Sequence, residues 1–114
     1  MELVLTLKKE WFDLIKSGEK KVEFREIKPY WVRRLVGNWQ VYQDSLPFLR
    51  GIYKMPFGVD RIRFKNGYGK NAPQFVIEWR ALKVDFPTDG LCPTDTDLSK
   101  SVFCLVLGDI ISFD

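Results

Sequence analysis

IKSGEKKVEFREIKPYW, residues Ile15–Trp31, joins the end of a predicted helix to a predicted strand and to the start of a second helix. Gly18 suits the left-handed residue that follows a helix end, so we expect the first helix to stop there. Beyond it, Val22 and Phe24 alternate with charged residues, which is the period of a strand. This alternation predicts that Val22 and Phe24 face the core. The opposite, polar face carries Lys21, Glu23 and Arg25.

The residues before and after this stretch predict three further elements. Alternating leucines over Glu2–Lys8 predict a strand, and the spacing of apolar residues predicts a helix over about residues 9–17. Pro29 favours the start of a second helix, and Gly37 favours its end. The apolar side of this helix carries Trp31, Val32, Leu35 and Val36. Its opposite side carries Tyr30, Arg33 and Arg34.

The second half of the chain predicts a β-rich structure. We expect a strand over Trp39–Gln43, then a long hairpin formed by VDRIRFK (59–65) and QFVIEWRALKVDF (74–86). The apolar parity changes near Ala81, which predicts a bulge that bends the sheet. An acidic loop follows, and SVFCLVLGDIISF (101–113) predicts a final strand with a kink at Gly108.

Length and charge limit the class of protein. A chain of 114 residues with 46% hydrophobic content forms one domain with its own core. The net charge is +3, yet residues 1–80 carry sixteen basic and nine acidic side chains, whereas residues 81–114 carry two and six. This asymmetry favours a polyanionic partner for the first two thirds of the chain, while the acidic remainder is typical of a solubilising loop.

The content of cysteine and histidine excludes several kinds of chemistry. The chain has no histidine, so Ser-His-Asp and Cys-His catalysis and histidine zinc sites are excluded. Cys92 and Cys104 have neither the number nor the spacing of a disulfide framework, so we expect reduced thiols and no metal. No apolar segment has the length of a membrane span, and no leader pattern opens the chain. These observations predict a cytoplasmic protein without a cofactor.

The order strand, helix, then a strand with Gly18, Lys20, Glu23 and Arg25 resembles the ASCH domain family, whose fold is related to the RNA-binding PUA domain. The hairpin and the closing FCLVLGDII are similar to those of small bacterial and phage-encoded members. The resemblance implies one α+β domain over residues 1–114, with a mixed β pseudo-barrel of five to six strands flanked by two or more short helices. It also implies that the Gly-x-Lys-x-x-Glu-x-Arg strand lines a cleft that binds RNA or a nucleoside.

Some relatives are amidohydrolases that act on acetylated cytidine, with a motif lysine and a motif threonine among the catalytic groups. By similarity these positions fall on Lys20 and Glu23, so Glu23 stands where the threonine is expected. Lys20 and Glu23 are therefore the candidate catalytic residues, but the absence of the hydroxyl weakens acyl transfer. Thr6 is the nearest hydroxyl in sequence. We therefore expect this site to bind a ligand rather than to catalyse a reaction.

The residues themselves are consistent with a site at this strand. Glu23 and Arg25 lie about 7 Å apart on one face of the strand, within reach of an ion pair. Arg25 can bind a phosphate or a base edge, and Lys20 can supply a point charge. Lys20 has the opposite parity, so it can join them only if the turn after Gly18 reaches over the end of the sheet. The alternative is a solvated strand face with a surface salt bridge.

Further basic and aromatic residues extend the candidate nucleic-acid surface. Tyr30, Arg33 and Arg34 can stack a base and hold phosphates, or they form an ordinary exposed helix face. The strand face with Arg61, Arg63 and Lys65 can continue a phosphate track, unless Glu78 on the next strand neutralises it. Tyr68 and Lys70 lie in a hairpin loop that is either a flap or a turn. Lys21 is the last of the candidate nucleic-acid-binding residues.

Three functions follow from these patterns. The first is an RNA- or nucleoside-binding domain, which acts as a monomer or weak dimer. The second is a hydrolase for a modified pyrimidine nucleoside, or a metal-independent ribonuclease. The third is a protein-interaction module whose basic face meets an acidic partner. We expect Trp11, Trp31, Trp39 and Trp79 to fill the core.

Overall fold

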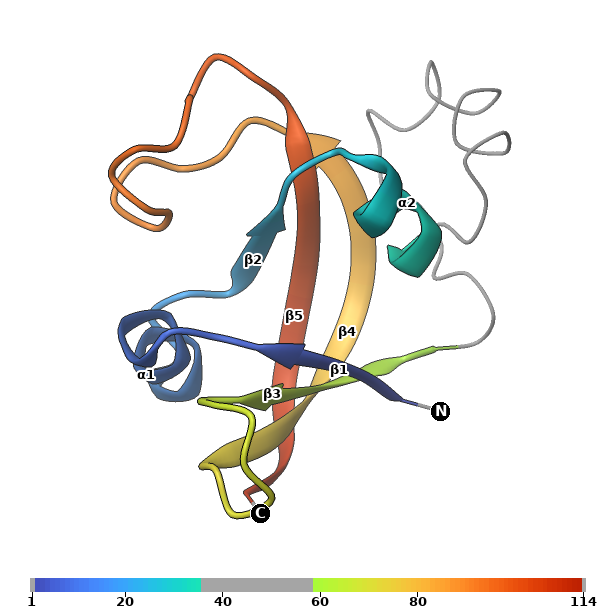
Figure 1. Ribbon diagram of the computed structural model, residues 1–114, viewed down its shortest axis with the longest axis vertical. Helices are drawn as coiled ribbons and strands as arrows, with labels where there is room; N and C mark the ends of the chain where they lie inside the picture. Colours follow the sequence, from blue (N-terminus) through green and yellow to red (C-terminus); the bar gives the residue numbers. More distant parts are fainter. Residues whose placement is uncertain (1, 36–58, 114) are drawn as a thin grey trace.

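The computed structural model describes residues 2–35 and 59–113, which form one curled five-stranded sheet with two helices (Figure 1). The strands are β1 (Glu2–Thr6), β2 (Val22–Arg25), β3 (Arg61–Lys65), β4 (Gln74–Asp85) and β5 (Val102–Phe113). The helices are α1 (Lys9–Ser17) and α2 (Pro29–Leu35). The predicted strand over Trp39–Gln43 and the helix end at Gly37 lie outside the described residues. No helix in the described ranges is long and apolar enough to cross a membrane.

The sheet is mixed, and its order is β1-β3-β4-β5-β2. β1 pairs with β3 in parallel, and every other pair is antiparallel. The first two strands of the chain are therefore the two edges of the sheet. The mixed sheet and its helices confirm the predicted α+β class, and the sheet forms a half-barrel rather than a closed one.

Irregular pairing between β4 and β5 allows the sheet to curl. Their register shifts three times between Val76 and Ala81, which confirms the bulge predicted near Ala81. β5 continues through Gly108, where a Cβ atom would lie 2.4 Å from Arg80 Nε. The Arg80 side chain crosses directly over the backbone here, so a larger residue would require this exposed side chain to shift.

The hydrophobic core fills the inside of the half-barrel. Phe64, Phe75 and Phe103 are fully buried, and the ring of Phe12 from α1 packs with its centroid 5.0 Å from that of Phe75. Each helix places two fully or nearly fully buried apolar side chains in this core. They are Phe12 and Ile15 from α1, and Val32 and Leu35 from α2.

The two faces of β2 are the reverse of the prediction. Glu23 pairs with Leu105 and Arg25 with Phe103, and both of these partners belong to the core. Because directly opposite residues of an antiparallel pair share a face, Glu23 and Arg25 lie on the inner face. Val22 and Phe24 are only half-buried, so the prediction that they face the core is wrong. Alternation defines two faces of a strand, but ion pairing here allows the charged face to turn inward.

Candidate functional site

Lys20, Glu23 and Arg25 form a continuous buried ion network. Lys20 Nζ donates to Glu23 Oε1 over 3.1 Å, and Arg25 Nη2 donates to Glu23 Oε2 over 2.8 Å. The Lys20 and Glu23 side chains are 2% and 7% exposed, and that of Arg25 is 18% exposed. The predicted convergence of the three residues is confirmed. The alternative of a solvated face with a surface salt bridge is wrong.

The end of helix α1 explains how Lys20 reaches a strand face of opposite parity. Gly18 has a φ of 87°, and its N–H donates to the carbonyl of Ile15 over 3.1 Å. The N–H of Lys20 then donates to the carbonyl of Leu14 over 3.0 Å, so the chain folds back against the helix. This left-handed cap directs the Lys20 side chain over the end of the sheet and onto Glu23.

Aromatic rings surround both cations of the network. Lys20 Nζ lies 4.4 Å from the centroid of the Trp11 ring and 5.4 Å from that of Phe24. Arg25 Cζ lies 4.8 Å from the centroid of the Trp31 ring. Cation–π contacts of this kind replace part of the hydration that burial removes. Trp11 and Trp31 are thus partly buried around the network, whereas Trp79 lies in the core as predicted.

Arg25 also connects the two edge strands of the half-barrel. Its Nη2 donates to the carbonyl of Thr6 in β1 over 3.4 Å, while Arg25 itself belongs to β2. We call the opening between β1 and β2 the seam. Arg25 Nε is buried and has no hydrogen-bond partner among the described residues. One donor of the guanidinium is therefore left unsatisfied inside the wall.

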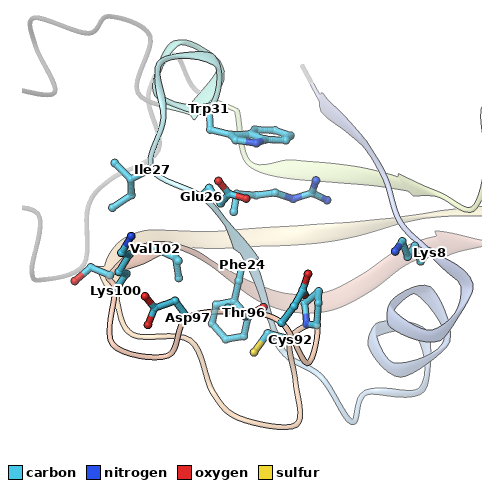
Figure 2. A pocket seen from close by; sticks show the side chains of 14 residues that line it. Lys8, Phe24, Glu26, Ile27, Trp31, Cys92, Thr96, Asp97, Lys100 and Val102 are labelled. Atoms are coloured by element: carbon cyan, nitrogen blue, oxygen red, sulfur yellow. The ribbon is translucent and has the colours of Figure 1, made fainter.

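A cleft of about 730 Å³ lies beside the network (Figure 2). Its volume is within the range of small-molecule sites, roughly 300–1,000 Å³. One wall comes from the segment that links β2 to α2. It contributes Phe24, Arg25, Glu26, Ile27 and Trp31. The other wall is residues 92–101, which we call the rim loop, together with Val102. Lys8 completes the lining.

Arg25 is the predicted site residue that lines this cleft. Neither Lys20 nor Glu23 belongs to the lining, so they contact the cleft through Arg25. Lys20 and Lys21 instead border a smaller recess of about 270 Å³ near Gly18 and Gly108. The network thus acts as a support behind the cleft wall.

The aromatic-basic residues of α2 lie next to the cleft but not in its lining. Arg34 donates to the Tyr30 hydroxyl over 3.1 Å and to the carbonyl of Val4 over 3.0 Å. Its guanidinium carbon also lies 5.5 Å from the centroid of the Trp31 ring. Arg33 is exposed. Tyr30 and Arg34 therefore pack against the Trp31 side of the wall.

The basic residues of β3 and its hairpin loop lie away from the cleft. Arg61 pairs with Asp60 over 3.2 Å, and Arg63 pairs with Glu2 over 2.7 Å. Lys65 is half-buried beside them, and Lys70 is exposed. Tyr68, 91% exposed, is in the loop between β3 and β4. Figure 1 shows this loop at the bottom of the view, whereas α2 lies in the upper half.

Neutralisation of this strand by Glu78 was one of two alternatives, and the hydrogen bonds of Glu78 do not favour it. Glu78 lies directly opposite Arg61 in the sheet, but its carboxylate accepts from the N–H of Asp109 over 2.9 Å and from Arg80 over 3.4 Å. The hydrogen bond from Asp109 lowers the pKa of Glu78, and Arg80 adds to this effect. Glu2 and Asp60 take the pairing role instead.

Sequence reasoning missed much of the cleft wall. Phe24 and Trp31 were expected in the core, and the rim loop was interpreted as a solubilising segment. A local signal existed for Trp31, because it lies in the first turn of a helix that begins just after the motif arginine. No local signal places the rim loop, since it is remote in sequence from β2.

The described residues contain no group of three or more acidic, cysteine or histidine side chains that could hold a metal ion. Cys92 and Cys104 are free thiols. Comparisons with family models, curated proteins and solved structures found no match to this chain. The function therefore has to be argued from the cleft and the network.

Proposed function

We propose that the protein is an RNA- or nucleoside-binding domain whose cleft holds a nucleobase beside Arg25 and Trp31. The observation that carries the proposal is the state of Arg25. Its guanidinium is fixed by Glu23 and lies over the Trp31 ring, and Arg25 is one of the residues that line the cleft.

The resemblance to ASCH domains supports the same proposal. The half-barrel has the order strand, helix and motif strand on which the resemblance rests, and it brings Lys20, Glu23 and Arg25 together. We therefore propose that the sheet is a PUA-like pseudo-barrel, open at the seam. The cleft then corresponds to the ligand site that the resemblance implies.

Base recognition follows from the chemistry of the wall. Aromatic stacking contributes about 1–3 kcal/mol per base and tolerates any sequence, because every base has a π face. Phe24 and Trp31 offer such faces at the lining of the cleft. A carbonyl or ring nitrogen of the base accepts a hydrogen bond from the Arg25 guanidinium, which gives orientation to the stacked ring.

Lys20 and Glu23 act as positioning residues in this proposal. Both are buried behind the wall, and Glu23 accepts from Phe24 N, Lys20 Nζ and Arg25 Nη2. Three donors thus hold one carboxylate, and this carboxylate fixes the position of the guanidinium. Recognition is favoured over hydrolysis because neither candidate catalytic group reaches the lining.

The proposal is tested by titrating the protein with ribonucleosides and with short single-stranded RNA. Tryptophan fluorescence and calorimetry give the affinity. Arg25→Ala is expected to lower the affinity roughly tenfold, because it removes the orienting donor. Arg80→Ala is the matched control, since Arg80 is an exposed arginine outside the lining and outside the predicted nucleic-acid surface.

Circular dichroism shows whether each variant is folded. If Arg25→Ala does not fold, Trp31→Leu removes the stacking surface while it leaves the ion network in place. Unchanged affinity in a folded Arg25→Ala or Trp31→Leu protein would contradict the assignment of the cleft. Failure of the natural protein to bind any of these ligands would contradict the proposed function itself.

A further inference from the structure

We infer that the cleft selects an unphosphorylated nucleoside, and that Asp95 and Asp97 of the rim loop are the residues that reject phosphate. This inference rests on the proposed function and narrows its ligand class. It follows from the charges around the cleft, from the fixed position of one carboxylate and from the ion pair that already holds Arg25.

The charges that line the cleft are balanced. Lys8, Arg25 and Lys100 provide the positive charges, and Glu26, Asp95 and Asp97 provide the negative ones. A cleft that binds phosphate normally carries an excess of cations, which attract the anion and offset the free-energy cost of removing its water. The described residues that line this cleft provide no such excess. The basic strand β3, with its own ion pairs to Glu2 and Asp60, lies elsewhere.

The cation best placed to meet a phosphate is already neutralised. Arg25 is paired with Glu23 over 2.8 Å, and the remaining cation of the network, Lys20, is buried under Trp11 and is not part of the lining. A phosphate at this wall would compete with an existing ion pair. A neutral acceptor on a base does not compete in this way, because it can accept from the Arg25 guanidinium while the ion pair with Glu23 stays in place.

The rim loop holds its negative charge in place. The Asp97 carboxylate accepts from the Ser99 hydroxyl over 2.6 Å and from the Ser99 N–H over 2.9 Å. The hydroxyl and then the backbone hydrogen bond lower the pKa of Asp97, so this group stays ionised at neutral pH. Asp95, two residues away, is also exposed and also lines the cleft. A phosphate at the rim meets like charges there.

The same carboxylates suit a sugar. Ribose hydroxyls are hydrogen-bond donors, and ionised carboxylates offer acceptors only. With the base against Trp31, the sugar of a bound nucleoside is directed toward the rim loop, whose Asp97 and Thr96 lie across from Trp31 in Figure 2. The rim carboxylates therefore favour the hydroxyls and disfavour a phosphate on the same ligand.

The test compares each of the four ribonucleosides with its own 5′-monophosphate by calorimetry. We expect the best nucleoside to bind about threefold to tenfold more tightly than its monophosphate, because the like charges that repel the phosphate are partly screened by solvent. In an Asp95→Asn/Asp97→Asn protein this preference should disappear. Asp89→Asn is the matched control, because Asp89 is exposed in the same connection but outside the lining.

Each outcome separates the two proposals. A monophosphate that binds as tightly as its nucleoside overturns the inference and leaves the proposed function intact. If neither ligand binds, the inference fails, and the proposed function fails with it only if short single-stranded RNA does not bind either. A preference that persists in the folded double variant overturns the assignment to Asp95 and Asp97. Asparagine keeps an oxygen for the Ser99 hydrogen bonds, so the variant is expected to retain the loop.

Discussion

Glu23 is the residue on which the buried charges depend. Among the described residues, Lys20 and Glu23 are the charged side chains that are buried, and Arg25 is the partly buried third member. One carboxylate separates two cations and also accepts from the backbone N–H of Phe24. Glu23 therefore offsets the repulsion between the Lys20 and Arg25 cations.

Replacing this carboxylate by its amide tests that role. Glu23→Gln keeps the shape but leaves Lys20 and Arg25 as uncompensated cations, so we expect the free energy of unfolding to fall by about 3–5 kcal/mol. Urea denaturation gives this value. Asp13→Asn is the control, because it breaks an exposed pair with Lys9 and should cost about 0–1 kcal/mol. Equal losses in both proteins would show that burial gives Glu23 no special weight.

The inward position of Glu23 was not available from sequence. Val22 and Phe24 are the more hydrophobic pair, so any reading by hydrophobicity places them inside. The outcome depends on Lys20, which arrives from the helix cap, and on Trp31, which arrives from the next helix. The hydrophobic pattern of a strand does not predict which side chains of other elements will pack against it.

At the level of elements, the cap of α1 connects local sequence to the site. Gly18 is in the left-handed region, and a Cβ atom there would meet nothing within 4 Å. The need for glycine is thus a matter of backbone conformation and not of space. The same cap orients the segment that carries Lys20.

Gly18→Ala is expected to destabilise the protein by about 1 kcal/mol, because alanine pays a steric cost at positive φ. Gly69→Ala is the comparison, since Gly69 has open space and no left-handed φ, and it should be neutral or slightly stabilising. Thermal denaturation of the two variants distinguishes them. A stable Gly18→Ala protein would mean that the turn can adopt another conformation.

Element boundaries were the most predictable part of the fold. Gly18 ends α1, Pro29 begins α2, and the expected hairpin forms as β3 and β4. These predictions depend on one or two residues whose backbone preferences are strong. The cleft depends instead on the approach of the rim loop to the β2–α2 segment. These two segments are far apart in the sequence, so no local pattern predicts that they meet.

At the level of the whole molecule, a buried thiol links global stability to alkaline pH. Burial raises the pKa of Cys104 from its ordinary value of 9.0 to about 11. Between these values the unfolded chain loses the proton while the folded protein keeps it. The unfolded state then binds fewer protons, so stability present below pH 9.0 decreases as the pH rises toward about 11.

We therefore expect the melting temperature of the natural protein to fall more steeply over that range than that of Cys104→Ala. Differential scanning calorimetry at a series of pH values measures both slopes. Cys92→Ala retains the Cys104 thiol and should keep the steep slope. Parallel slopes for all three proteins would show that other groups govern alkaline unfolding.

The half-barrel leaves β1 at an edge of the sheet, and such an edge normally recruits a strand from a second molecule. The carbonyls of Val4 and Thr6 point away from β3, and each accepts a hydrogen bond from an arginine, Arg34 and Arg25 respectively. An incoming strand would have to displace both guanidinium groups before it could pair. The arginines that surround the cleft thus also protect the open side of the sheet against aggregation.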